Sequence, residues 1–173
     1  MKVNKKGALM KLSSKLKKEL NIQMNREFDA FYNYLAMSCY FEDQSLKGIG
    51  KWMRHQSQEE HEHMMKYYNY IFDRDGTAEF DAVKKPKSNY KSAKEVFEAA
   101  LKHEEHVTKT THQLLDLAQK EKDHATVNFL QWFVEEQVEE EAQFKDILNT
   151  LEVLGKDSRS LYFLDKELGS ARE

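Results

Sequence analysis

Apolar residues recur alternately three and four positions apart over four long stretches of the chain, and polar residues and turn signals separate these stretches. This spacing is typical of helices that pack one face into the core of a bundle. The pattern predicts four long helices and a short fifth one, over residues 13–41, 45–73, 92–121, 123–154 and 158–167. We therefore expect an all-α protein, a four-helix bundle followed by a short C-terminal helix.

The four long helices are predicted to begin at residues whose side chains can accept a hydrogen bond from a backbone N–H group. Ser92 and Glu95 form an S-x-x-E capping box at the start of the third helix. The other predicted caps are Ser13 or Ser14, Ser45 and Asp123. These side chains fix where we expect the helices to start.

The segment before the third helix predicts how the helices are connected. Residues 76–91 have no helical period and contain Pro86, the only proline of the chain. A helix of ~26 residues is ~39 Å long, and ~16 extended residues can reach ~50 Å. The segment can therefore cross the whole bundle and leave the second and third helices parallel. Short turns join the first helix to the second and the third to the fourth, so both of these pairs are predicted to be antiparallel.

Six residues that are acidic, amide or imidazole interrupt the apolar faces, each near the middle of its helix. They are Glu27, Glu60, His63, Glu104, Gln137 and Glu140. No Lys or Arg lies on these faces, and burial of four carboxylates without a cation would cost much free energy. A register error of one residue would place an acid in water instead, but it would have to occur on all four helices together. We therefore predict that the six residues meet in the core around metal ions.

The residue types narrow the choice of metal. Several carboxylates with one imidazole suit iron or manganese better than zinc, although Zn²⁺ or Mn²⁺ could occupy the same oxygens. The oxygens suffice for two ions with one carboxylate as a bridge. Glu60 and His63 are three residues apart, so they share a helix face and can bind the same ion. In the same stretch, we expect Glu59 and Glu62 to lie to the side and His61 to point elsewhere.

Composition limits the remaining possibilities. The 173 residues favour one domain over 1–173, and six glycines with a single proline suit an all-helical chain. A net charge of −3 gives no general argument for binding nucleic acid. The lone Cys39 excludes an intramolecular disulfide and is expected to be a small core or interface residue. No uncharged segment approaches the ~18–20 residues of a membrane span, and the Lys-rich start lacks the apolar core of a signal peptide. We expect a soluble cytoplasmic protein.

The sequence resembles the prokaryotic haem-free ferritins over nearly its whole length. The segments that carry the resemblance are QMNREFDAFYNYLAM, WMRHQSQEEHEHM, KHEEHVTK, NFLQWFVEEQVEEE and LYFLDKELG. Ferritin-like bundles with one long crossover and inward carboxylates are a known architecture. The resemblance implies a hollow homo-oligomer of 24 subunits. Such a cage takes up Fe²⁺, oxidises it with O₂ or H₂O₂ and stores a ferric mineral.

The resemblance also implies roles for individual residues. Glu27, Glu60 and His63 match the ligands of the first iron site of the family's ferroxidase centre. Glu60, as the bridge, and Glu104 match the second site, and the residues beside it are Gln137 and Glu140. Two iron ions per subunit are therefore expected at this diiron centre.

Further matches lie around the diiron centre. A third iron site on the inner surface is matched by Glu59, Glu136, Glu139 and Glu140, and an acidic inner surface by Glu59, Glu62, Glu136 and Glu139. Tyr34 matches a tyrosine that could donate an electron during oxygen reduction, although it could also be a core aromatic residue. Trp132 matches a neighbouring tryptophan, and we interpret it as a core aromatic residue.

Three departures refine the resemblance. Bacterioferritins carry a second Glu-x-x-His on the fourth helix, where this chain has Gln137-x-x-Glu140. Their haem-ligating methionine is replaced here by His61, so haem is not expected. Animal ferritins line a cation channel with acids where this chain has Val127 and Leu130. The iron entry route is therefore left open.

Three other interpretations are weaker. Basic residues near the N-terminus suggest a DNA-binding mini-ferritin, since a basic tail binds phosphates without sequence preference. They are Lys2, Lys5, Lys6, Lys11, Lys15, Lys17 and Lys18. Mini-ferritins, however, build their iron site between subunits, whereas these ligands lie within one chain, so nucleic acid is not an expected partner. A diiron oxidase would need a substrate cavity and a redox partner, and a scaffold would have no reason to place acids in its core.

Overall fold

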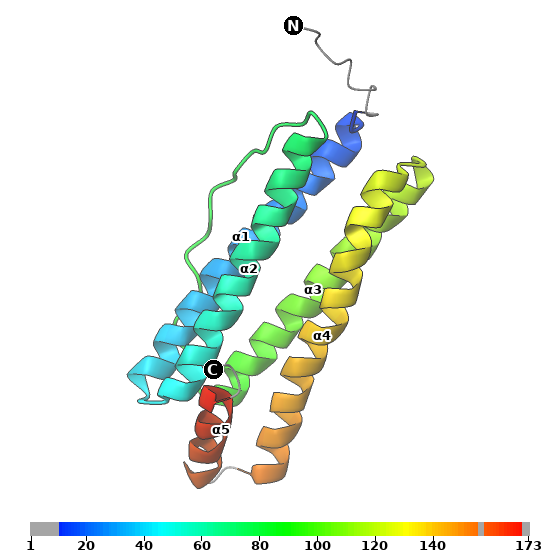
Figure 1. Ribbon diagram of the computed structural model, residues 1–173. Coiled ribbons are helices and arrows are strands. Elements are labelled where there is room, and N and C mark those ends of the chain that lie inside the picture. The colour runs from blue at the N-terminus through cyan, green and yellow to red at the C-terminus, as the bar shows by residue number, and fades with distance from the viewer. Residues whose placement is uncertain (1–10, 156–157, 171–173) are drawn as a thin grey trace, which may run out of the picture.

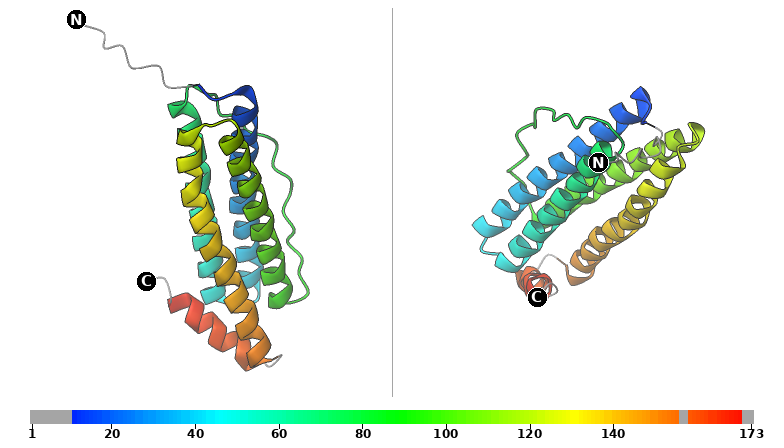
Figure 2. Two further views of the ribbon diagram at one scale, coloured as in Figure 1. Left: turned by 90° about the vertical axis from the view of Figure 1, so that its right-hand side faces the viewer. Right: turned by 45° about the horizontal axis from the view of Figure 1, so that its top comes forward.

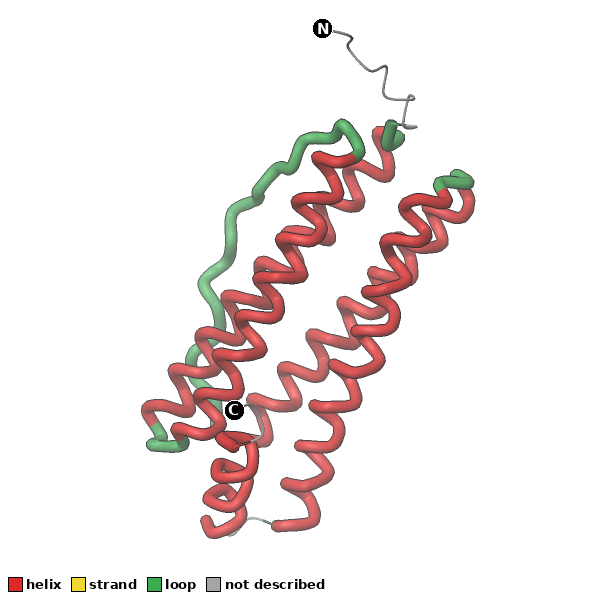
Figure 3. Tube along the Cα trace, viewed as in Figure 1, coloured by secondary structure: helices red, strands yellow, loops and turns green. Residues whose placement is uncertain are grey.

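The computed structural model describes residues 11–155 and 158–170 of the chain. Within these residues the secondary structure is helical, with no strand (Figures 1 and 3). The helices are α1 (Ser14–Asp43), α2 (Lys47–Asp73), α3 (Ala93–Lys120), α4 (His124–Leu154) and α5 (Ser158–Ser170). The four long helices lie side by side, and α5 lies at the end of the bundle where α4 finishes (Figure 1). The predicted all-α bundle with a short fifth helix is confirmed.

The connections follow the predicted topology. α1 and α2 form one antiparallel hairpin, and α3 and α4 form the other (Figure 2). The segment between α2 and α3 runs along α1 from one end to the other: Asn21 Nδ2 donates to the Thr77 carbonyl at 3.1 Å near its start, and the rings of Tyr40 and Tyr90 are 5.5 Å apart near its end. Because this segment crosses the bundle, α2 and α3 point in the same direction.

Three of the predicted helix caps form as expected. The hydroxyl of Ser13 accepts from the Leu16 N–H at 3.0 Å, and that of Ser92 accepts from the Glu95 N–H at 3.2 Å. The carboxylate of Asp123 accepts from a backbone N–H of the first turn of α4 at 3.1 Å. Each side chain thereby satisfies a donor that has no partner within its own helix.

The prediction that Ser45 caps the second helix is wrong. Ser45 has a φ of 61°, in the left-handed region, because it forms the tight turn after α1, where its N–H donates to the Glu42 carbonyl at 3.0 Å. The N-cap position of α2 is Leu46, whose side chain makes no cap hydrogen bond. Instead, Asp165 of α5 accepts from the Ile49 N–H at 2.9 Å. The cap of α2 therefore comes from the other end of the chain.

Two glycines allow α5 to lie against the start of α2. A Cβ atom at Gly48 would lie 1.8 Å from the Asp165 carbonyl oxygen, and one at Gly169 would lie 2.9 Å from the Gly48 Cα. No side chain fits at Gly48 unless the backbone of α5 moves away. The absence of a Cβ atom at both positions therefore permits the backbone contact that brings Asp165 to α2.

The apolar core consists of two clusters at different levels of the bundle. One lies toward α5, and its largest aromatic members are Tyr34, Phe41, Trp52, Phe97 and Phe144. The other lies toward the opposite end, and it includes Leu20, Met24, Tyr67, Leu114 and Phe133. The buried carboxylates of the four helices, with His63 and Gln137, fall between these clusters along the chain. The core is therefore divided by a polar layer at mid-bundle.

The structure also tests the expectations for Cys39 and for membrane-spanning segments. Cys39 is exposed on α1 in this chain, so the alternative that it is a core residue is wrong. Its side chain falls on the outer face of α1, one position after the buried Ser38. Among the described residues, none of the helices combines the length and the apolar character required to cross a bilayer.

Candidate metal centre

The polar layer contains the six residues that the sequence predicted to point inward. Each of them is at most 3% exposed, and they are Glu27, Glu60, His63, Glu104, Gln137 and Glu140. Helical periodicity places them there, because each continues the buried stripe of its own helix. No Lys or Arg is among the buried polar residues of this layer. The carboxylates are thus enclosed without a compensating cationic side chain.

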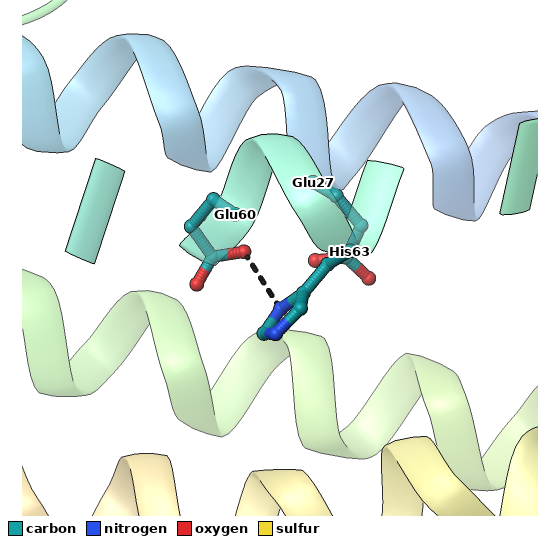
Figure 4. A group of neighbouring side chains, drawn as sticks. All are labelled: Glu27, Glu60 and His63. Atoms are coloured by element: carbon teal, nitrogen blue, oxygen red, sulfur yellow. Dashed lines mark ion pairs between the residues drawn. The ribbon is translucent and has the colours of Figure 1, made fainter. Parts of the chain in front are cut away.

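The first cluster of ligand groups lies between α1 and α2. Glu27, Glu60 and His63 offer atoms that all lie within 4.8 Å of one another. Figure 4 shows Glu60 and His63 extending from α2 and Glu27 reaching them from α1. His63 Nδ1 is 3.4 Å from Glu60 Oε2. This cluster offers two carboxylates and one imidazole nitrogen to a single cation.

Two oxygens of this first cluster are available to a cation. Gln23 Nε2 donates to Glu27 Oε1 at 3.0 Å. Glu27 Oε2 and Glu60 Oε1 are buried and have no hydrogen-bond partner among the described residues. A buried acceptor without a partner is costly, and a bound cation would satisfy both oxygens.

A second cluster extends from the same imidazole toward α4. His63, Glu136 and Glu140 also offer atoms within 4.8 Å of one another, and His63 Nε2 is 3.8 Å from Glu136 Oε1. The two ring nitrogens of His63 therefore face different carboxylates. Glu136 is partly exposed, whereas Glu140 is buried. This cluster leads from the closed layer toward the surface of α4.

Glu104 completes the layer from α3. Tyr34 donates a hydrogen bond from its hydroxyl to Glu104 Oε1, and Gln137 Nε2 donates to Glu104 Oε2 at 3.1 Å. Both oxygens of Glu104 therefore have donors. The two donors come from α1 and α4, so Glu104 is held in place by the helices on either side of α3.

The remaining predicted residues lie at the edge of these clusters or outside them. Glu59 is half-buried, and one of its oxygens lies 3.3 Å from His55 Nδ1. Glu62 and Glu139 are exposed, and neither Glu59 nor Glu139 belongs to the two clusters within the described part of the chain. The ring of His61 lies 5.8 Å from that of Phe31, away from the layer as expected.

Trp132 contacts the layer directly. Its ring packs edge-on against that of His63 with centroids 5.3 Å apart, and Lys66 Nζ lies 4.1 Å from its centroid. It is partly exposed, so it covers the imidazole from the side of α4. The interpretation of Trp132 as a core aromatic residue holds only in part, because it packs against the core cluster but stays partly exposed.

Burial and mutual repulsion change the acidity of the layer. Burial raises the pKa of Glu27 and Glu60 well above the usual range, and the neighbouring carboxylates raise them further. The pKa of Glu140 rises from 4.5 to about 8, first through burial and then through Glu104 and Glu59. Burial and the Glu104 carboxylate also raise the pKa of Tyr34. Without a cation, the layer retains protons at neutral pH, and a divalent cation would displace them.

Two glutamines of the layer were missed as functional residues from the sequence. Gln23 and Gln56 are both 0% exposed, and each donates to a carboxylate, Gln23 to Glu27 and Gln56 to Glu140. Each precedes a predicted ligand on its own helix by four residues, which is the spacing that puts two side chains on one face. That spacing was the available signal, but an uncharged amide does not stand out as a charged group does.

Replacement of Glu27 or Glu104 by Leu should leave the metal-free protein as stable as the parent, or more stable by ~1–4 kcal/mol. Apolar residues of similar size in place of buried charged groups are often neutral or stabilising, because the desolvation cost disappears. Thermal unfolding in the presence of a chelator measures this effect. A loss of several kcal/mol in both variants would mean that these acids hold the fold together.

The comparisons with known proteins agree with the fold. Residues 17–154 match the ferritin-like domain model. The chain is 44% identical over 159 residues to the bacterial non-heme ferritin of Staphylococcus aureus strain MRSA252, covering 92% of this chain and 96% of that protein. The corresponding protein of Staphylococcus haemolyticus is 42% identical over the same coverage.

The solved structures that resemble this chain are also ferritins. An open-pore ferritin from the hyperthermophilic archaeon Archaeoglobus fulgidus has a TM-score of 0.93 and 45% identity, covering 95% of this chain and 100% of that one. An engineered closed form of the same ferritin has a TM-score of 0.90 at 45% identity, with coverages of 93% and 98%. The chain therefore belongs to the ferritin family. Its relatives place it among the prokaryotic non-haem ferritins, with iron storage as its function.

Proposed function

We propose that the chain oxidises Fe²⁺ with O₂, or with H₂O₂, at a diiron centre within each subunit. The observation that carries this proposal is the closed layer of four buried carboxylates with an imidazole and no cationic side chain. Such a layer is costly in the metal-free protein, and hard oxygen ligands with one imidazole suit iron. Oxidation of two ions per subunit is the expected activity.

We assign the first ion to Glu27, Glu60 and His63, whose ligand atoms already converge. The second ion is assigned to Glu60 as the bridge and to Glu104, with Gln137 and Glu140 beside it. Glu60 Oε1 has no hydrogen-bond partner among the described residues, and this oxygen is available for the bridging role. Two ferrous ions held together can deliver two electrons to O₂ without releasing a radical. Carboxylate ligands then favour the ferric state.

We further propose that Tyr34 could supply one more electron to the reduction of O₂, beyond the two that the ferrous ions give. Its hydroxyl donates to Glu104 Oε1, and its side chain is 0% exposed. Loss of an electron from a phenol also requires loss of its proton, and Glu104 provides the acceptor at the hydrogen bond already formed. The ring is also held by stacking on Phe144 at 5.7 Å. A buried phenol hydroxyl needs a hydrogen-bond partner in any role, so the proposal rests on the identity of that partner, Glu104, as a ligand of the second ion.

The stored product requires a container and an acidic surface. We propose that 24 copies of the chain form a hollow cage whose inner surface carries Glu59, Glu62, Glu136 and Glu139. Size-exclusion mass, together with iron content after aerobic addition of Fe²⁺, tests storage and assembly at once. A small monomer that holds no more than two or three irons would contradict the proposed cage and mineral.

Replacement of Glu136 or Glu139 by Ala should preserve the oxidation of two irons but alter the iron-to-oxygen ratio or slow transfer into the mineral. These acids lack a dedicated imidazole and lie nearer the surface of α4, so an ion there should be weakly held and exchangeable. Oxygen consumption per iron measures the effect, with exposed Glu135→Ala as the control of equal charge.

Crystals soaked in Fe²⁺ provide a direct test of this third site. We expect an ion at lower occupancy beside Glu59, Glu136 and Glu139. If that region is empty at iron loads that fill the first two sites, the third site does not exist.

A further inference from the structure

Gln56 has an unusual environment for an uncharged side chain. It lies on α2, one turn before Glu60, and is 0% exposed. Its Nε2 donates to Glu140 Oε2 on α4 at 2.9 Å. Its carbonyl oxygen Oε1 is buried and finds no hydrogen-bond partner within the described residues. The amide N–H of Gln56 is therefore bonded within the layer, whereas its carbonyl oxygen has no partner there.

We propose that Gln56 is a positioning residue of the metal centre, which holds Glu140 in place and presents its own carbonyl oxygen to a bound cation or to that cation's water. This inference rests on the proposed diiron function. It adds a member to the layer that is neither acidic nor an imidazole.

The position of Glu140 explains why it needs such a partner. Its carboxylate belongs to the cluster with His63 and Glu136. Its charge acts on Glu60, and the charge of Glu104 acts on it. A glutamate side chain has several rotatable bonds, so it can turn toward either side. The hydrogen bond from Gln56 fixes Oε2 and thereby selects one orientation.

The choice of an amide follows from the charge of the site. A Lys or Arg at this position would bind Glu140 more strongly, but it would repel Fe²⁺ from the layer. Two other acids of the layer also accept a hydrogen bond from a glutamine amide: Gln23 donates to Glu27, and Gln137 donates to Glu104. Three acids of the layer are thus each held by one glutamine, with no positive charge added.

The free carbonyl of Gln56 points to a ligand. An amide oxygen is among the oxygens that hard divalent cations accept in proteins. A carbonyl oxygen that is buried without a hydrogen-bond partner costs free energy, and a cation or a water molecule bound beside it would remove this cost. The neighbouring Glu60 Oε1 is in the same condition. The two oxygens lie on one face of α2, four residues apart, toward the layer.

Gln56→Met tests this role, because Met has a similar length and volume but neither donates nor accepts a strong hydrogen bond. Anaerobic titration with Co²⁺, followed by visible absorption, reports binding without oxidation. We expect the ion held by Glu27, Glu60 and His63 to bind as in the parent. We expect the affinity of the ion that depends on Glu140 to fall by ~10–100-fold, the usual effect of losing an outer partner of a ligand.

Four further variants sharpen the test. Gln58→Met removes an exposed glutamine from the same helix and should bind Co²⁺ like the parent. Glu140→Gln should weaken the same ion, and Gln56→Met in that background should add little if the two residues act together. Gln56→Asn, whose amide is too short to reach Glu140, should reproduce the loss should Gln56→Met fail to fold. A crystal structure of either Gln56 variant should show the Glu140 carboxylate displaced.

The outcomes separate this inference from the proposed function. If the parent binds two Co²⁺ ions and both Gln56 variants bind them within twofold of the parent with Glu140 unmoved, Gln56 has no positioning role. If the parent itself binds no ion at the layer, the proposed function fails instead. Weakened binding confined to the Glu140-dependent ion supports the role argued here.

Discussion

Replacement of Glu60 by Ala should abolish the rapid oxidation of the first two Fe²⁺ ions added per subunit, while the fold and assembly remain intact. Glu60 is the only carboxylate assigned to both ions. Its removal therefore eliminates the shared ligand that holds them side by side. Misplacement of reacting groups by 1 Å can cost ~100-fold in rate, so loss of a bridging ligand should cost at least that much.

Stopped-flow absorbance of the ferric product after mixing with aerobic buffer measures this rate. Glu105→Ala is a suitable control, because Glu105 neighbours Glu104 in the chain, carries the same charge and is exposed on α3. His63→Ala should resemble Glu60→Ala, since it removes the only imidazole of the layer. Oxidation at the parent rate in Glu60→Ala would show that the centre lies elsewhere.

The metal-free protein should lose stability as the pH rises from about 4.5 to about 8. Glu27, Glu60 and Glu140 all have pKa values raised by burial. A carboxyl whose folded pKa is raised favours the folded state while it is protonated. Its contribution is therefore fully present below the unfolded pKa and is lost as the pH rises through the folded pKa.

The size of this effect can be bounded for each group. One titrating group changes the free energy of unfolding by at most ~1.4 kcal/mol per pH unit. Glu140, with a pKa of about 8, should act between roughly pH 4.5 and pH 8. Denaturant unfolding of the chelated protein at several pH values measures the slope. Glu140→Gln should flatten it, and exposed Glu105→Gln should not; a parent slope of zero would contradict the raised pKa values.

The inward direction of the acids could be predicted from the sequence because burial in a helix follows a fixed period. Glu104 occurs on a stripe with Phe97, Val107 and Leu114, and all four are buried. A charged residue on such a stripe is conspicuous, so its position alone indicates a site. The same period predicted the helices and the long crossover.

The hydrogen bonds within the layer could not be predicted, because they depend on how helices pack. Gln137 donates to Glu104 across two helices, and Gln56 donates to Glu140 across the two hairpins. Neither link has a fixed spacing along the chain. The prediction of Ser45 as the cap of α2 was wrong for a related reason. The acceptor at this helix end is Asp165, which is 116 residues from its donor Ile49.

The contact between α5 and α2 has a consequence for the order of folding. α2 lacks a local side-chain cap, and within the described part of the chain the acceptor for its N-terminal turn is Asp165 of α5. During synthesis, the first hairpin therefore emerges with an unsatisfied helix end. The bond from the Ile49 N–H to Asp165 can form only after α5 has left the ribosome, and contacts between residues far apart in sequence close late. Until then, the backbone of α2 beside Gly48 is accessible to solvent and proteases. Docking of α5 therefore protects the start of a helix that was synthesised more than a hundred residues earlier.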